Sequence, residues 1–209
     1  MMAPRPGTVG LCGIAAFSGL VGLEHVLRPD YDPRSRYVSE YAVGPYRHVM
    51  TTAFFALGIG STATLVDLSR ALPAPARSRS GLVFLGVWSG AILVAGLFPT
   101  DLSGPNGRPE HPTTPGTVHA LAGITGFLSL PLAACLLGRR FRRDPAWRRF
   151  ARPSLLLSAL QSAAVVLSIA SPVRYIGVNE RVLIVCDLAW LAWLSQVLRH
   201  APYQEQELT

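Results

Sequence analysis

Residues 115–138 read PGTVHALAGITGFLSLPLAACLLG and contain no acidic residue and no arginine. A helix needs roughly 20 consecutive apolar residues to cross the hydrocarbon core of a bilayer. This stretch is long enough, and it lacks the alternating polar face of a helix that packs on a water-soluble core. We therefore interpret it as a membrane-spanning helix.

The rest of the chain repeats this pattern. Of its 209 residues, 50% are hydrophobic and only 15% are charged. The sequence predicts an all-α polytopic membrane protein, a single six-helix bundle that covers residues 1–209. The predicted spans are residues 8–27, 45–68, 81–98, 115–138, 153–173 and 180–198.

The first apolar stretch has a second interpretation as a cleaved signal peptide. Arg5 precedes an apolar run from Val9 to Leu23, which is the order of features in such peptides. The run continues into Glu24 and His25 without a small-x-small cleavage site. This continuation favours a first span that is retained.

Arginine is distributed unevenly between the two sides of the predicted bundle. All 19 Lys and Arg positions are arginine, and seven of them lie in residues 139–153, RRFRRDPAWRRFARP. Twelve arginines fall on the side of this loop and seven on the other. Because short arginine-rich loops stay in the cytoplasm, both termini are predicted to be cytoplasmic. This pattern argues against a nucleic-acid partner, although the loop also suits anionic lipid headgroups.

The cysteines and histidines do not predict a metal or a cofactor. Cys12, Cys135 and Cys186 all lie within predicted spans, where a small buried apolar role is expected. The spacings H-x-x-x-H, H-E-x-x-H and C-x-x-C are missing from the sequence. Zinc ligands supplied by separate helices would leave no such local pattern, so that alternative stays open.

Small and capping residues predict local packing. Gly86 and Gly90 form G-x-x-x-G in the third span, which predicts a close helix approach at that point. Pro45 suits the first position of the second span, where a missing N–H removes no hydrogen bond. Asn179 is expected to cap the sixth span.

Most of the other polar residues gather where the spans end on the arginine-poor side. An ionisable group at membrane depth is costly, and it normally faces the bundle interior and pairs with another group. The candidate catalytic residues are His119, Asp101, Asp187, Glu180 and Glu40. The candidate ligand-binding residues are Glu24, His25, Ser39, His48, Asn179 and Arg181.

Asp187 is the deepest of these residues. It follows Glu180 by seven residues on the same helical face, which places it about 10 Å further into the bilayer. It is either a proton donor, acceptor or ligand anchor, or a partner for Arg181 or a neighbouring histidine. For His119 the alternatives are acid–base chemistry beside a carboxylate and an ordinary hydrogen bond to a carbonyl or water.

Four segments resemble the bacterial domain of unknown function 998 family in their order and spacing. They are YDPRSRYVSEYAVGPYRH at 31–48, FPTD at 98–101, TPGTVHALAG at 114–123 and GVNER at 177–181. The resemblance covers nearly the whole chain. It implies a six-helix or similar bundle in a bacterial plasma membrane, and it implies no established activity.

Three functions follow as hypotheses. The first is a protein that binds or processes an amphipathic lipid or isoprenoid-type ligand from the extracytoplasmic side. If that protein is an enzyme, Asp187 with Glu24 or Glu40 would protonate an alkene or epoxide, by analogy with small membrane-bound terpene cyclases. The second is a small transporter. The third is a non-catalytic accessory subunit with a structural polar cluster.

The structure can separate these hypotheses. An apolar pocket capped by His119, Asp101 and Glu180 favours the ligand, a closed polar network without a cavity favours the subunit, and a water-lined path favours the transporter. The sequence leaves open whether the protein is an enzyme, and it does not fix the oligomeric state. Membrane lipids are the expected partners.

Overall fold

The computed structural model describes residues 5–200, and within them the chain is all-helical. Each of six long helices is long and apolar enough to cross a membrane, which confirms the predicted fold class. The long helices are α1 (Thr8–Leu27), α2 (Arg47–Ala71), α3 (Arg79–Leu97), α4 (Thr114–Phe141), α5 (Ala151–Ala170) and α6 (Ile176–His200). Three short 3₁₀ helices are η1 (Val38–Ala42), η2 (Arg148–Phe150) and η3 (Val173–Tyr175).

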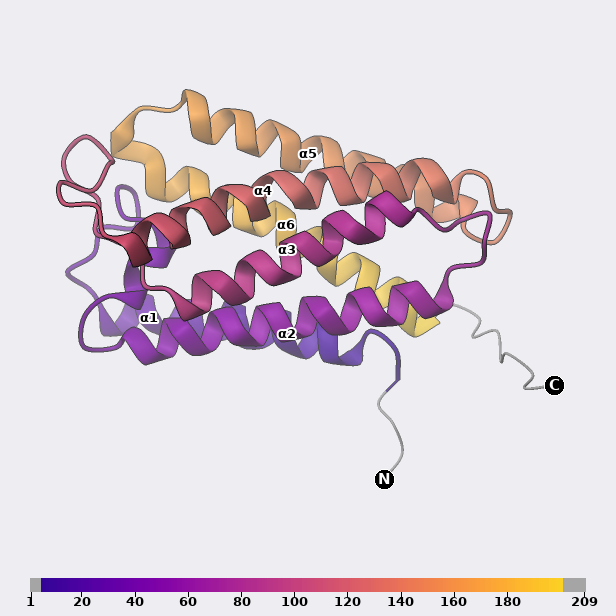
Figure 1. Ribbon diagram of the computed structural model, residues 1–209, viewed down its shortest axis with the longest axis horizontal. Coiled ribbons are helices and arrows are strands. Elements are labelled where there is room, and N and C mark those ends of the chain that lie inside the picture. The colour runs from indigo at the N-terminus through magenta and orange to yellow at the C-terminus, as the bar shows by residue number, and fades with distance from the viewer. Residues whose placement is uncertain (1–4, 201–209) are drawn as a thin grey trace.

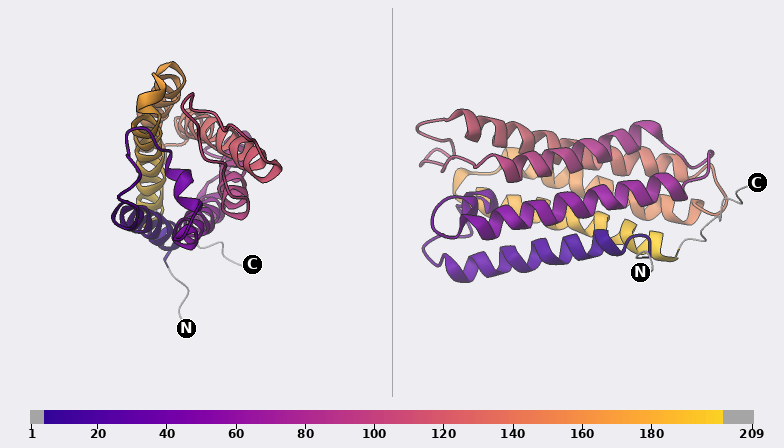
Figure 2. Two further views of the ribbon diagram at one scale, coloured as in Figure 1. Left: turned by 90° about the vertical axis from the view of Figure 1, so that its left-hand side faces the viewer. Right: turned by 60° about the horizontal axis from the view of Figure 1, so that its bottom comes forward.

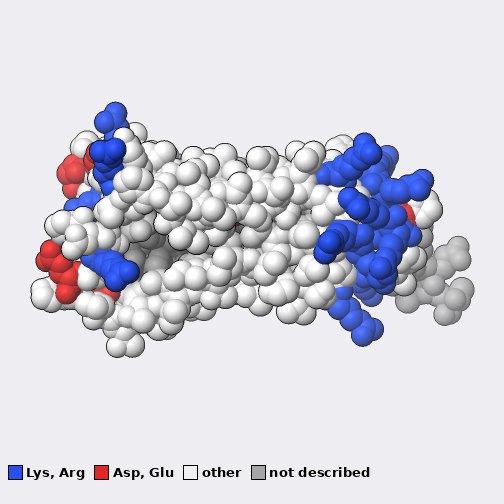
Figure 3. Space-filling model, turned by 90° about the horizontal axis from the view of Figure 1, so that it is seen from above, with Lys and Arg blue, Asp and Glu red and all other residues white. Residues whose placement is uncertain are grey.

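The helices run along one axis, so their connections fall at two ends (Figure 1). The loops 28–46, 98–113 and 171–175 share one end, which we call the site end. The loops 72–78 and 142–150 lie at the opposite end, together with the start of α1 and the end of α6. Figure 3 shows arginines gathered over this second end, which we call the arginine-rich end.

The helices pack in the order of the sequence. Each of the helices α1 to α5 contacts the next helix along the chain, and α6 closes the arrangement by contacting α1. Seen from the site end, α5 and α6 stand on one side and α3 and α4 on the other, with α1 and α2 between them (Figure 2). The inner faces of all six helices therefore point toward a common centre.

Helices α1 and α2 approach each other closely at two glycines. A Cβ added at Gly13 would lie 2.4 Å from the carbonyl oxygen of Ala56, and one at Gly60 would lie 3.0 Å from the Cα of Gly13. The close approach predicted at Gly86 and Gly90 is wrong, because a Cβ at Gly90 meets nothing within 4 Å. Gly90 lies on an exposed face of α3, which the spacing of glycines alone does not reveal.

Two helix starts differ from those predicted. Gly44 turns the chain with φ 100°, and α2 begins only at Arg47, so Pro45 precedes the helix. Because η3 leads directly into α6, that helix begins at Ile176 and Asn179 lies inside its first turn. Asn179 is therefore not the cap that the sequence predicted.

Hydrogen bonds close the half of the bundle nearest the arginine-rich end. The indole N–H of Trp190 on α6 donates to Oγ of Ser154 on α5 (3.1 Å), which donates to the carbonyl of Ala134 on α4 (2.8 Å). Ser158 on α5 adds a bond to the carbonyl of Pro131 on α4 (2.9 Å). These bonds tie three helices together, and α4 and α5 separate toward the site end (Figure 1).

Candidate functional site

A cavity of about 480 Å³ lies between the helices in the half of the bundle near the site end. Ligand pockets usually measure about 300–1,000 Å³ and are mostly apolar, so this cavity has the size and lining of a small-molecule site. Each long helix contributes to its wall. Representative apolar lining residues are Phe17 of α1, Phe54 of α2, Trp88 of α3, Phe127 of α4, Val165 of α5 and Leu183 of α6.

The cavity opens sideways between α4 and α5. Ile124 of α4 and Ile169 of α5 both line the cavity, yet they are 57% and 79% exposed. Gly123 also lines it, and a Cβ added there would meet nothing within 4 Å. Figure 3 shows a hollow in the surface near the site end. In a membrane, this opening would face the lipid.

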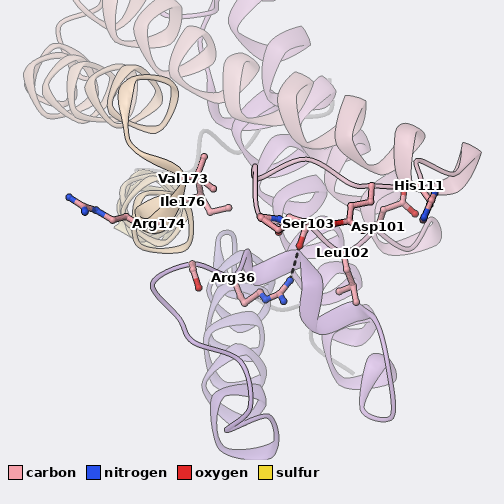
Figure 4. A pocket seen from close by; sticks show the side chains of 12 residues that line it. Arg36, Asp101, Leu102, Ser103, His111, Val173, Arg174 and Ile176 are labelled. Atoms are coloured by element: carbon pink, nitrogen blue, oxygen red, sulfur yellow. Dashed lines mark hydrogen bonds between the residues drawn. The ribbon is translucent and has the colours of Figure 1, made fainter.

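A second hollow of about 720 Å³ lies among the loops of the site end, and we call it the mouth. Its polar lining includes Arg36, Glu110 and His111, and it shares Asp101 and Ser103 with the cavity. Figure 4 shows Arg36 reaching toward Ser103 from the first loop, with the residues of the last loop on the far side. A polar mouth and an apolar cavity thus share one boundary.

His119 is a buried residue of the cavity wall. Its Nδ1 lies 3.0 Å from the carbonyl oxygen of Ala95 and 2.8 Å from that of Phe98. Two acceptor oxygens require a proton on Nδ1, so in the neutral ring Nε2 is the nitrogen without one. The ring stands edge-on to Phe54 with 5.7 Å between centroids. His119 therefore holds the end of α3 and brings a histidine edge to the cavity.

Asp101 organises the start of α4. Its two carboxylate oxygens accept hydrogen bonds from the N–H and the hydroxyl of Thr113, each 2.8 Å long. Thr113 in turn accepts a bond from the N–H of Gly116 (3.1 Å). Negative charge at a helix N-terminus is favourable because the first N–H groups have no partner within the helix. Asp101 thus has a structural role at a position where it also borders the cavity and the mouth.

Glu40 is fully buried and ties the first loop to the loop after α3. It accepts hydrogen bonds from the backbone N–H of Ser103 (2.8 Å) and from the Ser103 hydroxyl. Arg36 lies 3.4 Å from its other oxygen and donates to the Ser103 carbonyl (3.0 Å). These contacts build the partition between the mouth and the cavity.

Glu180 on α6 also binds the first loop. Its Oε2 accepts a hydrogen bond from the backbone N–H of Val38 in η1, and the side chain lines the cavity. Ser39, the next residue of η1, also lines the cavity. The first loop therefore lies over the cavity as a lid, held by α6 and by the loop after α3.

Arg181 and His25 join α6 to α1 away from the cavity. One terminal nitrogen of Arg181 donates to the carbonyls of Pro33, Arg36 and Gly177 at 2.8–2.9 Å. Its Nε lies 3.2 Å from Nε2 of His25. Because the His25 Nδ1 lies 2.7 Å from the Val21 carbonyl, Nε2 is the nitrogen that accepts.

The first loop is held by a second arginine. Arg28 pairs with Asp30 at 2.9 Å, donates to the Val43 carbonyl at 3.0 Å and stacks over the ring of Tyr31. The hydrogen bond from Arg28 holds the pKa of Asp30 below its ordinary value. Arg28 thus joins the two ends of the first loop, and Arg181 holds its middle.

Asp187 has the opposite character. It is 0% exposed and lines the cavity, and neither of its carboxyl oxygens has a hydrogen-bond partner among the described residues. Gln161 of α5 is its polar neighbour, and the amide atoms of Gln161 also lack a partner there. Asp187 is therefore a buried acid beside the neutral amide of Gln161, and it forms no ion pair with a cation among the described residues.

The remaining predicted site residues do not line the cavity. Glu24 is fully buried, with both oxygens unpartnered among residues 5–200. Asn179 is buried, and its carbonyl accepts a bond from Ser168 at 3.4 Å. His48 is exposed on α2. The structure thus collects Ser39, Asp101, His119, Glu180 and Asp187 at the cavity, with Glu40 directly behind its lid.

Several contributors to this site were not singled out by the sequence. Ser103 and Thr113 bind the two loop carboxylates, and Gly123 and Phe127 shape the cavity wall. Gly123 belongs to the segment TPGTVHALAG, and the small size of glycine is the sequence signal that could have marked this position of the cavity wall. Within residues 5–200, no three His, Cys, Asp or Glu side chains are grouped so as to hold a metal ion.

The fold and the apolar helices define a multi-pass membrane protein. The chain belongs to the family described as "Protein of unknown function (DUF998)", whose model matches residues 11–197. This match confirms the resemblance, and it covers all four segments on which the resemblance rested. A comparison with curated proteins finds no match. A comparison with solved structures also finds none.

Proposed function

We propose that this protein binds an amphipathic lipid or isoprenoid-type molecule, with the polar head in the mouth and the apolar body in the cavity. The observation that carries this proposal is the shared boundary of the two hollows at Asp101 and Ser103. The sideways opening between α4 and α5 supplies a route by which such a molecule enters from the bilayer without crossing water.

The distribution of arginine supports the orientation of the site. Arginine-rich loops stay on the cytoplasmic side, so the arginine-rich end belongs inside and the site end outside. In this arrangement the start of α1, near Arg5, and the end of α6, near Arg199, face the cytoplasm of a bacterial cell. Residues 1–4 and 201–209 lie outside the described part of the chain. The ligand then comes from the outer leaflet or from the outer surface.

The structural-subunit hypothesis is also supported by part of the polar cluster. Hydrogen bonds join Glu40, Asp101 and Arg181 to other groups of the protein, as expected of a structural cluster. The cavity is what favours the ligand over the subunit, since Asp101, His119 and Glu180 all border it. The side chains packed around Trp190 fill the half of the bundle near the arginine-rich end. This packing argues against the transporter hypothesis.

A blocked cavity tests the proposal. Gly123→Phe places a ring in open space inside the cavity, whereas Gly90→Phe places the same ring in open space on α3, at a residue that does not line the cavity. Native mass spectrometry of the gently solubilised proteins should show a lipid-sized adduct on the wild type and on Gly90→Phe. The adduct should be lost from Gly123→Phe.

Two outcomes would contradict the proposal. An adduct that persists on folded Gly123→Phe would place the lipid elsewhere on the protein surface. A wild-type protein that carries no adduct, and that takes up none of the lipids of its own membrane when these are added back, would leave the cavity without an occupant. The structural-subunit hypothesis would then replace the ligand hypothesis.

A further inference from the structure

Apart from Tyr37, the ionisable residues that line the cavity are carboxylic acids or histidine. Asp101, Glu180 and Asp187 border it together with His119, and no arginine lies among its lining residues. The chain as a whole has 19 arginines and a net charge of +7, so this arrangement runs against its composition. A phosphate or carboxylate in the cavity would meet acids and no cation, which disfavours an anionic ligand there.

Two of the three acids are satisfied by the protein, and the third is not. Asp101 accepts two hydrogen bonds from Thr113, and Glu180 accepts one from Val38. Asp187 is fully buried and has no partner for either oxygen among the described residues. An acid at membrane depth normally pairs with another group.

Two arginines of the site end, Arg181 and Arg36, already make hydrogen bonds within the protein. Arg181 lies six residues before Asp187 in the sequence, but its guanidinium is held by three carbonyls and His25. Arg36 is held by Glu40 and by the carbonyl of Ser103, in the partition above the cavity. Neither residue is therefore positioned as the counter-ion of Asp187.

Aromatic rings line the same space. Phe17, Phe54, Trp88 and Phe127 come from four different helices and all border the cavity. Aromatic faces attract cations through the ring quadrupole, and cages of this kind hold ammonium groups in proteins. The cavity thus combines an acid that has no cationic partner among the described residues with several aromatic rings, and both features favour a positive charge over a negative one.

We propose that the ligand of this cavity is an apolar cation, an ammonium group on a hydrocarbon body, whose charge pairs with Asp187. This proposal rests on the proposed occupancy of the cavity, and it places the charged group of the ligand inside the cavity at Asp187 and not in the mouth. The hydrocarbon body fills the apolar part of the cavity, and the ammonium group supplies the counter-charge that the protein itself does not provide.

Two probes that differ only in charge test the pairing. One is 3-bromoadamantan-1-amine, which is an ammonium at neutral pH, and the other is 3-bromoadamantan-1-ol. Bromine quenches indole fluorescence at short range, and Trp88 is a cavity residue that is only 2% exposed. Quenching of Trp88 therefore reports entry into the cavity, and a Trp88→Phe variant gives the background from the other tryptophans.

The amine should quench the wild type with an apparent affinity at least about tenfold higher than that of the alcohol, which corresponds to ~1.4 kcal/mol. Asp187→Asn, of nearly the same shape, should bring the two affinities together, and Asp187→Glu should restore much of the preference. Gly123→Phe should abolish quenching by both probes. The Asp187→Glu variant guards against a loss that merely reflects misfolding.

Other outcomes would overturn the inference in distinguishable ways. Equal quenching by both probes in the wild type would reject the apolar cation and leave the proposed amphipathic ligand standing. Preference for the amine that survives in Asp187→Asn would reject Asp187 as its partner. Absence of quenching by either probe in folded protein would reject the cavity as a binding site, and with it the proposed function.

Discussion

Arg181 of α6 and His25 of α1 meet at 3.2 Å, between Nε of the guanidinium and Nε2 of the imidazole. The histidine accepts this bond because its other nitrogen faces the Val21 carbonyl at 2.7 Å. A neutral histidine thus accepts a hydrogen bond from an arginine that also donates to three carbonyls. This arrangement fixes the lid over the cavity to the first and last helices.

Replacement of Arg181 by lysine should destabilise the protein. A lysine has no planar fork, so it cannot serve His25 and the carbonyls of Pro33 and Arg36 together. Loss of bonds to a charged donor costs about 1.5–3 kcal/mol each, and we expect at least one such loss. Thermal unfolding in detergent, followed by tryptophan fluorescence, checks this. Arg47→Lys is the matched control, since Arg47 is exposed, and equal unfolding temperatures for the two variants would contradict the prediction.

Glu40→Ala should also lower the unfolding temperature. The change leaves the half-buried N–H and hydroxyl of Ser103 without an acceptor and removes the ion pair of Arg36. An unsatisfied buried donor costs about 1–3 kcal/mol. The same fluorescence measurement on Glu110→Ala, at an exposed position of the same end, gives the reference. If both alanine variants unfold at the same temperature, the partition between mouth and cavity does not depend on Glu40.

Two glycines of α4, Gly116 in its first turn and Gly123 about two turns further along, have opposite expected effects. A Cβ at Gly116 would lie 2.0 Å from a carboxylate oxygen of Asp101, whereas a Cβ at Gly123 meets nothing within 4 Å. Alanine is favoured over glycine in a helix by about 1 kcal/mol. Gly123→Ala should therefore keep or raise the unfolding temperature, and Gly116→Ala should lower it. A Gly116→Ala variant as stable as Gly123→Ala would show that Asp101 moves without cost.

Much of the fold is predictable because long apolar runs leave few alternatives to a spanning helix. The first helix, Thr8–Leu27, has the predicted bounds, whereas α6 begins four residues before the prediction because η3 joins it. Residue types and periodicity place an acid such as Asp187 on an inner face. They do not reveal which carbonyl or serine will lie opposite, since that depends on how the helices tilt.

In the candidate site, too, the sequence predicts which residues gather but not which partners they bind. The clustering of ionisable residues at one end follows from the order of the spans, and the cavity does gather Asp101, His119 and Glu180. Their chemical roles as catalytic or ligand-binding residues stay predictions. Which members are already satisfied is a property of tertiary contacts: Asp101 has Thr113 as its partner, while Asp187 has none in the described part of the chain.

Asp187→Asn should leave the stability of the ligand-free protein unchanged or raise it. A charge at the centre of a membrane helix costs about 2.5–3.5 kcal/mol, and no cation in the described structure pairs with Asp187 to offset that cost. Asp101→Asn should act in the opposite direction, because an amide keeps only one of the two acceptors that serve Thr113. Thermal unfolding of both variants beside the wild type provides the comparison. A clear fall for Asp187→Asn would mean that the carboxyl has a stabilising partner within the protein, and the acid would then no longer be available to anchor a ligand.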